Sequence, residues 1–333
     1  MKALLMTAPG APEVLQLQDV PDPVLTSDTA LLVRLKAAGV NPIDTKLRQR
    51  GTFFPDRLPS ILGCDGAGIV EAVGAKVKQF HIGEAVYFCQ GGLGGMPGTY
   101  AEFAVVEEQF VASKPTTLSF AEAAAAPLVL ITAWEALYDR ARLQAGQTVL
   151  VQAGAGGVGH VAIQLARLAG AEVYTTISTA EKAKLVAELG AAKAIDYRHT
   201  DPIAQVMELT AGTGVDVSFD TVGGGILSQC FGMTRVYGDV VSILAPAPQT
   251  DWKTARDRNL RVSFELMLTP MLQGLAQAQA HQAEILHRCA QWIDQGKLKI
   301  LLSHTFPLAE AAEAHRLLEA GSLTGKMALA IAD

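Results

Sequence analysis

The sequence predicts an α/β protein in which a β-rich N-terminal part is joined to a doubly wound parallel sheet. Residues 1–120 contain short apolar or alternating segments that are broken by proline and glycine, as in strands. An apolar run at 149–151 then leads into a glycine-rich turn. Beyond this turn, strand-like and helix-like segments alternate. Such alternation is typical of a parallel sheet with right-handed crossovers.

The composition limits the class of protein. A chain of 333 residues suggests about two domains. The net charge is −6 and no long Lys/Arg cluster occurs, which argues against nucleic acid as a partner. The four cysteines form no CxxC pair, so neither a zinc knuckle nor a disulfide scaffold is expected. The apolar N-terminal run is too short for a signal peptide, and no window approaches a membrane span. We therefore expect a cytoplasmic protein.

The central stretch is TVLVQAGAGGVGHVAIQLARLAG, which begins at residue 148. It predicts a strand, a tight turn and a helix. In a dinucleotide-binding unit the first glycine permits the turn, the second lets the pyrophosphate approach the backbone, and the third lets helix pack on strand. A plain packing turn is the alternative. The cofactor-binding residues predicted here are Gly154, Gly156, Gly157, Val158 and Gly159.

The remaining elements follow in order. In the β-rich part, strands are expected at 30–40, 68–73 and 101–106, and no helical period is sustained. From about Phe120 the chain becomes alanine-rich and helical, and Pro127 marks a kink or a helix start. After the glycine turn we expect strands at 172–177, 194–197, 215–220, 236–244, 261–268 and 298–304, and helices at 180–189, 203–210, 279–295 and 308–319. A last strand at 326–331 is expected to return to the N-terminal domain.

Seven motifs in order carry a family resemblance that covers nearly the whole chain. They are AAGVNPIDTKLR, GCDGAGIVEAVG, GTYAEF, AAAAPLVLITAWEAL, VLVQAGAGGVGHVAIQLA, GVDVSFDTVGG and LTGKMAL. The chain resembles the medium-chain dehydrogenase/reductase superfamily, in its zinc-independent quinone oxidoreductase (zeta-crystallin-like) branch. The resemblance implies a GroES-like catalytic domain over 1–121 and 270–333, a Rossmann dinucleotide-binding domain over 122–269, and an active site in the cleft between them.

The zinc ligands of the superfamily's alcohol dehydrogenases are not matched. Where those enzymes have a Cys, a His and a third Cys or acid, this sequence has Asn41, Cys64 and Leu128. One soft ligand cannot hold zinc, which needs at least three protein ligands. We therefore expect no metal and interpret Cys64 as a small buried hydrophobe. Without a Lewis acid, reduction of an electron-poor acceptor is easier than oxidation of an alcohol.

The second strand of the nucleotide unit lacks the acid that bonds the ribose of NAD, so the sequence favours NADPH over NADH. Ser178 and Lys182 can reach a 2′-phosphate, and the resemblance places Tyr197 beside it. Each has an alternative: Ser178 as a helix N-cap with Glu181 in a capping box, Lys182 as a surface charge, and Tyr197 as an interface aromatic. Further cofactor contacts are expected at Thr221, Val222, Ser242, Ile243 and Leu244.

The resemblance also implies which residues lie near the substrate. It places Asn41, Asp44 and Thr45 at the floor of the cleft and Thr132 on the helix beside the nicotinamide. Asn41 could stabilise a carbonyl oxygen as charge develops, or Asn41–Pro42 could be only a turn with Asp44 capping the next helix.

Related enoyl reductases carry a tyrosine proton donor where this chain has Phe53 and Phe54, so a flat quinone stacked on Phe53 fits better. Tyr100 is interpreted as structural, and His81, His160 and His199 as surface or boundary residues.

The function expected is an NADPH-dependent reductase that passes hydride to a small quinone or related electron-poor carbonyl acceptor. One alternative is a reductase of enone, alkenal or acrylate double bonds. An alternative of another class is a crystallin-like protein that binds nucleotide or nucleic acid. The resemblance also implies a homodimer in which the strand at 261–268 pairs with its symmetry mate.

Overall fold

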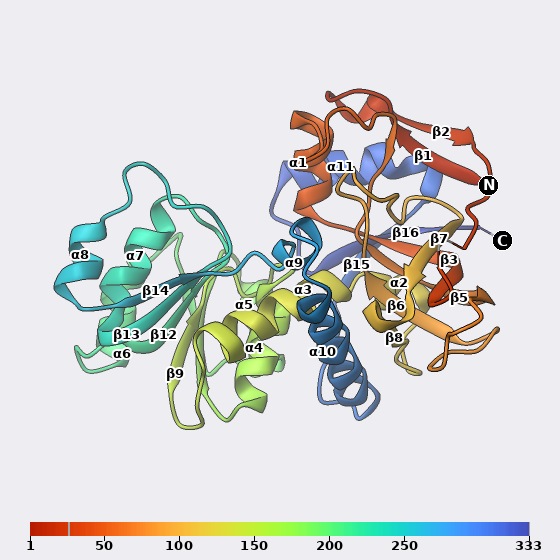
Figure 1. Cartoon of the computed structure of the whole chain (residues 1–333). Coiled ribbons are helices and arrows are strands. Elements are labelled where there is room, and N and C mark those ends of the chain that lie inside the picture. The colour runs from red at the N-terminus through yellow and green to blue at the C-terminus, as the bar shows by residue number, and fades with distance from the viewer. Residues whose placement is uncertain (26, 333) are drawn as a thin grey trace. The chain divides into compact units, whose positions relative to one another are not determined.

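The computed structural model describes residues 1–25 and 27–332, and the chain divides into two compact units. The first unit consists of Met1–Leu128 and Leu268–Asp333, and the second of Val129–Met267. We call them the catalytic unit and the nucleotide unit. Figure 1 shows the elements of each unit.

The catalytic unit is built on a seven-stranded sheet around the long strand β3 (Ala30–Val40). Its order is β15 (Leu302–Pro307), β16 (Lys326–Ala330), β3, β5 (Asp65–Val73), β6 (Ala85–Cys89) and β8 (Val111–Ser113), and β7 (Phe103–Glu107) also pairs with β3. A smaller sheet has the order β2 (Leu15–Asp19), β1 (Lys2–Met6) and β4 (Ser60–Ile61). The helices are α1 (Pro42–Arg50), α2 (Phe120–Ala124), α9 (Thr269–Leu272), α10 (Ala276–Asp294) and α11 (Ala311–Ala320).

Strand β3 explains why this part of the chain forms a sheet. Its alternating residues Leu31, Val33 and Leu35 are buried on one face, the period of a half-buried strand. Its C-terminal end is buried on both faces and leads directly into α1. The C-terminal strand β16 pairs antiparallel with this end, with Met327 opposite Val40. The predicted return of the last strand to the N-terminal domain is therefore confirmed.

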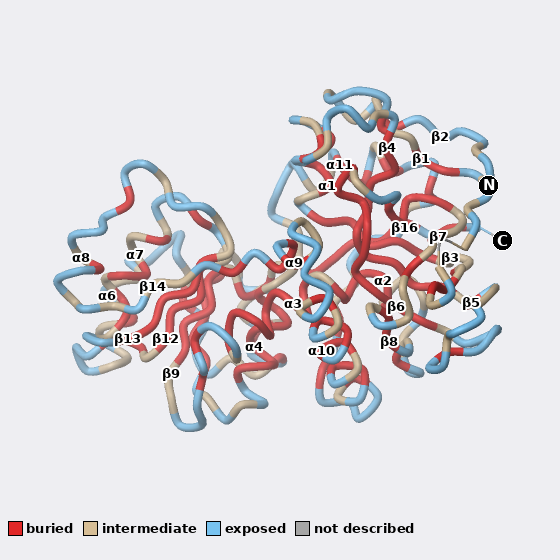
Figure 2. Tube along the Cα trace, in the orientation of Figure 1, coloured by how far each residue is buried: buried red, intermediate tan, exposed pale blue. Residues whose placement is uncertain are grey.

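The nucleotide unit contains a six-stranded sheet in which every pairing is parallel. The strand order is β11 (Lys193–Asp196), β10 (Glu172–Ile177), β9 (Thr148–Val151), β12 (Val215–Asp220), β13 (Thr234–Ser242) and β14 (Arg261–Phe264). Its helices are α3 (Pro127–Trp134), which continues as a π-helical turn at Glu135–Arg140, α4 (Gly159–Leu168), α5 (Ala180–Glu188), α6 (Pro202–Leu209), α7 (Gly225–Met233) and α8 (Trp252–Asp257). The central strands are buried along most of their length, as expected for a parallel sheet covered on both faces (Figure 2). The predicted Rossmann-type α/β fold is confirmed.

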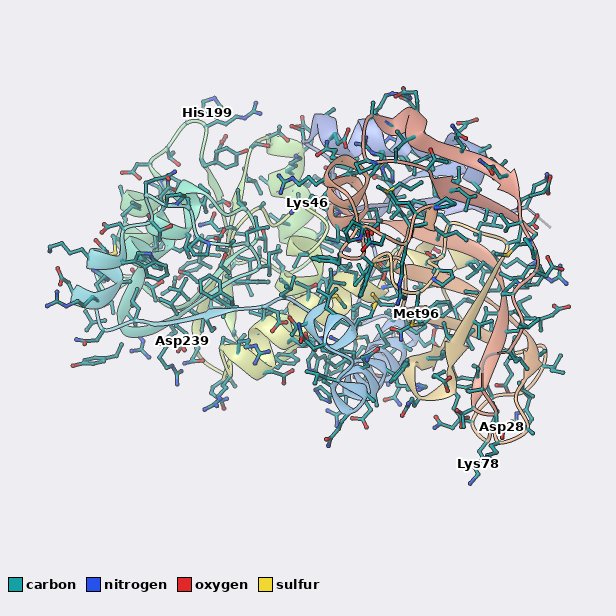
Figure 3. All side chains as sticks on the ribbon, turned by 45° about the horizontal axis from the view of Figure 1, so that its top comes forward. Asp28, Lys46, Lys78, Met96, His199 and Asp239 are labelled. Atoms are coloured by element: carbon teal, nitrogen blue, oxygen red, sulfur yellow. The ribbon has the colours of Figure 1, made fainter. Side chains whose placement is uncertain are left out.

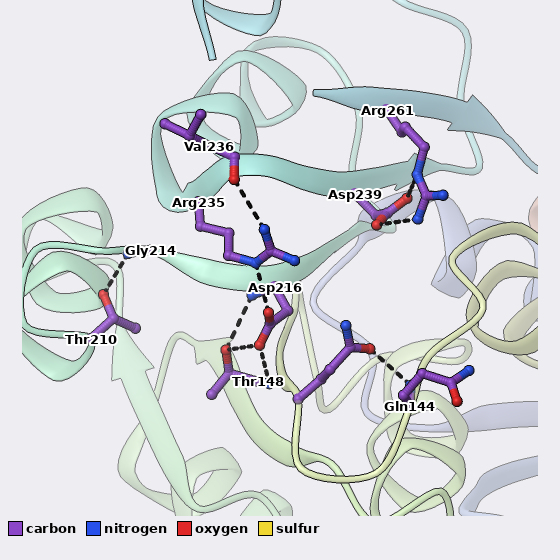
Figure 4. Close-up of polar contacts among 10 residues, drawn as sticks. Gln144, Thr148, Thr210, Gly214, Asp216, Arg235, Val236, Asp239 and Arg261 are labelled. Carbon is purple, nitrogen blue, oxygen red and sulfur yellow. Dashed lines mark hydrogen bonds and ion pairs between the residues drawn. The ribbon is translucent and has the colours of Figure 1, made fainter. Parts of the chain in front are cut away.

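Charged side chains fix neighbouring strands near their starts (Figure 4). Asp216 Oδ2 on β12 accepts hydrogen bonds from the Thr148 N–H at 2.8 Å and the Thr148 hydroxyl at 3.0 Å, and its Oδ1 accepts from Arg235 Nε at 2.7 Å. Arg261 on β14 forms a bidentate pair with Asp239 on β13, at 2.6 and 2.7 Å. These contacts join four neighbouring strands, β9, β12, β13 and β14. None of them involves the carboxyl ends of the strands, at the opposite edge of the sheet.

Some boundaries differ from the predicted ones. A helix, α1, lies in the N-terminal part where no helical period was expected, because Pro42 at the first helical position and the contact of Asp44 with Asn41 start it without a clear apolar stripe. Strand β15 begins at Leu302 rather than 298, and β14 ends at Phe264. Pro127 is a helix start, one of the two predicted possibilities.

Candidate functional site

The residues predicted to hold the cofactor gather at one edge of the nucleotide unit. The glycine turn follows β9, Ser178 follows β10, Tyr197 follows β11, and the remaining contacts follow β12 and β13. All five strands are parallel, so their carboxyl ends meet at the same edge. The sequence order of the strands reverses at β9, which lies between β10 and β12. Open α/β sheets bind ligands at such a switch point.

The glycines of the turn have different roles. A Cβ on Gly154 would lie 2.1 Å from Thr175 Oγ1, and one on Gly159 would lie 2.3 Å from the Ala153 carbonyl oxygen. These two glycines are therefore required for packing. A Cβ on Gly156 would meet only the Ala153 oxygen, at 3.2 Å, so this position is tight but less crowded than the other two. Gly157 and Val158 are half-buried and complete the turn.

The start of α4 suits an anion. No side chain caps the helix, and its dipole favours negative charge at this end, although the His160 N–H already donates to the Gly156 carbonyl at 3.1 Å. The backbone at Gly156, which has no side chain, lets a pyrophosphate approach closely. The residues present therefore fit the pyrophosphate of a dinucleotide.

Polar side chains hold this turn in place, and of these the sequence predicted only Thr221, as a cofactor contact. Thr176 Oγ1 accepts from the Ala153 N–H at 2.9 Å and donates to Gln152 Oε1 at 2.7 Å. The Thr221 hydroxyl donates to the Gln152 carbonyl at 2.7 Å. No sequence pattern singled out Thr176, whose hydroxyl orders the turn.

Ser178 differs from one of its predicted alternatives. The N-cap of α5 is Thr179, whose hydroxyl accepts from the Lys182 N–H at 3.3 Å, so Ser178 is not the cap. The half-buried Ser178 hydroxyl makes no hydrogen bond to the residues that the structure describes, and it is available to a ligand. Lys182 lies in the first turn of α5, and Tyr197 is 50% exposed.

The ends of β12 and β13 are tied together by Asp220, which is buried. Its Oδ1 accepts from the N–H groups of Val222 and Gly223 at 2.9 and 2.8 Å, and its Oδ2 accepts from the Ser242 hydroxyl at 2.9 Å. The N–H groups of Ile243 and Leu244 donate to the Asp220 carbonyl and the Ser242 hydroxyl. These N–H groups, which were expected to contact the cofactor, therefore form hydrogen bonds within the protein. Side chains and carbonyl oxygens remain available to contact the cofactor.

In the catalytic unit, Asn41 lies at the centre of a buried polar network. Its N–H donates to Asp44 Oδ2 at 2.8 Å, and its Nδ2 donates to Asp65 Oδ2 at 2.8 Å. Its Oδ1 accepts from the Lys326 ammonium group, which also donates to the Val40 carbonyl at 2.9 Å. Asn41 therefore starts α1, as the turn alternative requires, and one N–H of its amide remains uncommitted. Its role toward a carbonyl oxygen stays a prediction.

Asp44 is fully buried and is linked through two side chains to α11. Its Oδ2 accepts from the Tyr100 hydroxyl at 3.0 Å, and Tyr100 lies 3.2 Å from His315 Nε2. Arg48 Nε donates to His315 Nδ1 at 3.3 Å. Nε2 of the neutral ring must therefore carry the proton, and His315, Tyr100 and Asp44 form a directional chain. Tyr100 is buried and structural, as predicted.

Burial shifts the pKa values of Asp44 and His315, the two ends of this series of hydrogen bonds. Desolvation raises the pKa of Asp44 to about 7, and Asp65 adds to the rise. Desolvation lowers the pKa of His315 to about 3, helped by the nearby Arg48 cation. Asp44 Oδ1 accepts no hydrogen bond from any residue that the structure describes. A carboxyl group with this environment can hold a proton near neutral pH.

The positions that correspond to zinc ligands are occupied by this network. The Asp65 carboxylate faces Lys326, and its Oδ1 accepts from the Leu128 N–H at 2.9 Å. Cys64 is buried. A hydrogen bond with the Cys89 thiol, the largest single influence, lowers its pKa, but desolvation together with the charges of Asp44 and Asp65 raises the pKa overall. Within residues 1–25 and 27–332, no three His, Cys, Asp or Glu side chains converge as metal ligands.

The other predicted substrate-side residues are placed as follows. The Thr45 hydroxyl donates to the Pro42 carbonyl at 3.0 Å, and Phe53 is 50% exposed. Thr132 lies on α3 in the nucleotide unit and is buried. His199 projects from the surface as predicted (Figure 3), whereas His160 is completely buried, so its predicted surface position is wrong. His160 Nδ1 lies 3.0 Å from the Gly156 carbonyl, one turn earlier, which a sequence pattern does not reveal.

Comparison with known proteins agrees with this arrangement. Residues 27–116 match the alcohol dehydrogenase GroES-like domain family, and residues 189–329 match the zinc-binding dehydrogenase family. The chain is 34% identical over 330 residues to a quinone oxidoreductase of Pseudomonas aeruginosa, which covers 98% of this chain and 99% of the relative.

Two solved structures are also similar over nearly the full length. An NAD-dependent alcohol dehydrogenase has a TM-score of 0.89 and 32% identity, covering 100% of both chains. The quinone oxidoreductase of Escherichia coli complexed with NADPH has a TM-score of 0.87 and 29% identity, covering 99% of this chain and 100% of that one. The chain is therefore an oxidoreductase that belongs to the quinone oxidoreductase branch of the medium-chain dehydrogenase/reductase superfamily.

Proposed function

We propose that the protein is an NADPH-dependent, zinc-independent reductase that delivers hydride to a quinone or a related electron-poor carbonyl acceptor. The observation that carries this proposal is the buried Asn41–Asp65–Lys326 network. By the resemblance Asn41 stands at a zinc-ligand position, and its amide is bound there by Asp65 and the Lys326 ammonium group, which supports a site without zinc. An acceptor that is already polarised needs no Lewis acid to accept hydride.

The nucleotide unit supplies the cofactor part of the proposal. NADPH, when bound, supplies the hydride. The turn Gly154–Gly159 and the start of α4 would hold its pyrophosphate. The uncommitted Ser178 hydroxyl, with Lys182 and Tyr197, would receive the 2′-phosphate, and the end of β10 offers no carboxylate in the position that selects NADH.

In the catalytic unit, the remaining N–H of Asn41 is proposed to donate to the acceptor oxygen as negative charge develops. Asp44 positions Asn41 through the backbone bond at 2.8 Å, and its raised pKa makes it a candidate proton store. Thr45, Phe53 and Thr132 complete the proposed substrate-side set, with Phe53 offering a ring to a flat acceptor.

The test is a comparison of cofactors followed by an acceptor screen. We expect kcat/KM to be higher with NADPH than with NADH, and NADPH oxidation to proceed with 1,4-benzoquinone. Activity with a 2-enone but not with benzoquinone would instead establish the double-bond reductase. Activity lost to a chelator and restored by zinc, together with stoichiometric zinc in the purified protein, would overturn the proposal.

Two accompanying features are also proposed. The chain forms a homodimer through β14, an edge strand of the nucleotide sheet where Phe264 is 44% and the following Leu266 52% exposed. Light scattering after size-exclusion chromatography should give twice the chain mass, and Phe264→Lys should reduce it to the chain mass.

The proposed location is the cytoplasm, because all four cysteines are buried and unpaired, as in a reducing compartment. Among the described residues, every helix is too short or too polar to reach across a bilayer. Cell fractionation tests the location. A salt-dependent gel shift with single-stranded nucleic acid would favour the crystallin-like alternative.

A further inference from the structure

The catalytic unit contains a pocket of about 220 Å³ that none of the assigned residues explains. Three segments form it: residues 51–57, the glycine-rich loop at 91–98, and α9. The side chains that line it include Phe54, Arg57, Leu93, Met96, Met271 and Leu272. Met96, which Figure 3 labels, comes from the glycine-rich loop.

Close approach of the first two segments fixes the wall of this pocket. The Phe53 N–H donates to the Leu93 carbonyl at 3.2 Å. A Cβ on Gly94 would lie 2.3 Å from Thr52 Oγ1, and one on Gly95 would lie 3.0 Å from the Phe54 ring. Only glycine permits this packing, so the Phe54 ring is held as a flat wall rather than left to rotate.

Arg57 brings a positive charge to this otherwise apolar pocket. Its guanidinium carbon lies 5.4 Å from the centre of the Phe54 ring, and its Nη1 donates to the Gly95 carbonyl at 3.2 Å. Within the described residues it pairs with no carboxylate, whereas Arg34 forms a bidentate pair with Glu71. A guanidinium group has five N–H donors, so four of those of Arg57 remain for a ligand.

The size of the pocket limits what can enter. Its 220 Å³ is below the roughly 300–1,000 Å³ of sites that take drug-sized ligands. It therefore fits one ring rather than a polycyclic or long-chain molecule. The two methionines in its lining can adjust to the shape of the ring. The unpaired guanidinium favours a planar anion, since it can bind a carboxylate through two parallel hydrogen bonds.

We propose that this pocket is a specificity site for single-ring acceptors that carry a carboxylate, with the ring against Phe54 and the carboxylate on Arg57. That the bound molecule is reduced rests on the proposed function. That it binds in the pocket does not. Arg57 here sets specificity: it selects the substrate through its anionic group and takes no part in hydride transfer.

The experiment separates binding from turnover. Benzoate and benzyl alcohol are titrated into the protein without cofactor, with binding followed by ligand-observed NMR. We expect benzoate to bind more tightly, and Arg57→Gln to weaken benzoate about tenfold while leaving benzyl alcohol unchanged. Arg57→Lys should restore part of the affinity. Met271→Trp, which fills the pocket, should weaken both ligands. Arg142→Gln, an exposed residue of the nucleotide unit, is the matched control and should change neither.

In turnover, 4-carboxycinnamaldehyde is compared with its methyl ester at saturating NADPH. Arg57→Gln should raise KM about tenfold for the acid and leave both kcat and the KM of the ester unchanged. Equal benzoate affinity in the wild type and Arg57→Gln, or an equal loss for acid and ester, would refute the pocket assignment. Arg57-dependent benzoate binding without NADPH oxidation by any acceptor would support the pocket and refute the proposed function.

Discussion

Asp44 and His315 lie at the two ends of a buried series of hydrogen bonds through Tyr100, and their contributions to the pH dependence of stability should be opposite and should nearly cancel between about pH 4 and 6.5. Asp44 has a pKa of about 7 in the folded state, above the usual 3.8. Between these values the folded state holds a proton that the unfolded state has released. Stability therefore falls by about 1.4 kcal/mol for each pH unit gained, to a total of about 4 kcal/mol.

His315 acts in the opposite direction. Its pKa is about 3 in the folded state, below the usual 6.5. Between these values the unfolded state binds a proton that the folded state lacks. Stability therefore falls by about 1.4 kcal/mol for each pH unit lost, to a total of about 5 kcal/mol. The charged groups that face the pair are Asp65, Lys326, Arg48 and Glu319, and both substitutions below leave them in place.

Two single substitutions should each reveal the dependence of the free energy of unfolding on pH that one residue contributes. In Asp44→Asn the contribution of His315 is no longer offset, so stability should fall, relative to the wild type, as the pH is lowered from 6.5 toward 4. In His315→Gln, whose amide can still accept from Arg48 and donate to Tyr100, stability should fall as the pH is raised from 4 toward 7. The slopes should be about 1.4 kcal/mol per pH unit and of opposite sign. The double variant should be nearly flat again.

The assay must report on the catalytic unit alone, because a chain of two units need not unfold in one step. Of the three tryptophans, only Trp292 lies in this unit, so urea unfolding is followed by fluorescence in a background with Trp134 and Trp252 replaced by Phe. Asp28→Asn, an exposed carboxylate that pairs with Lys76, is the control and should leave the slope unchanged. Slopes of the same sign in the two variants would refute the reasoning.

Three further predictions concern the nucleotide unit and the metal. Gly156→Val should lower the melting temperature less than Gly159→Ala does, because the Cβ would lie 3.2 Å from the Ala153 oxygen in the first variant and 2.3 Å in the second. Gly156→Val should also raise the KM for NADPH more than tenfold; calorimetry and kinetics separate the two effects. Ser178→Asp should shift the kcat/KM ratio toward NADH at least tenfold, since a carboxylate repels the 2′-phosphate, and an unchanged ratio would remove Ser178 from the phosphate site. Prolonged dialysis against a chelator should leave the rate of quinone reduction unchanged, and a metal-dependent loss would contradict the role given to Lys326.

The parts of this protein that the sequence predicts are those that depend on near neighbours. The Gly154–Gly159 turn and the alternation of strands and helices can be recognised from short stretches of sequence. The fold predicted from them is confirmed. The capping of α5 illustrates the limit of such reasoning, because Ser178 and Thr179 are both good caps and only the backbone decides between them.

The buried network could not be predicted in this way. Lys326 meets Asn41 across 285 positions, and His315 meets Arg48 across 267. No local pattern in α11 marks His315 as a core residue, since it stands among alanine, glutamate and arginine. Its position follows only from the packing of α11 against α1, and a resemblance carried by short motifs does not include it.

The charge balance around Asp65 supports the proposed zinc independence with an argument that goes beyond the missing ligands. A buried carboxylate is stable only when a nearby positive charge or several hydrogen bonds compensate its desolvation. Desolvation raises the pKa of Asp65, and Lys326, Asn41 and the Leu128 N–H oppose this rise. A divalent cation brought to the same place would meet the Lys326 ammonium group and would have to displace it. The C-terminal strand β16, by carrying Lys326 back beside Asn41, therefore fixes the chemistry of this site as well as closing the sheet.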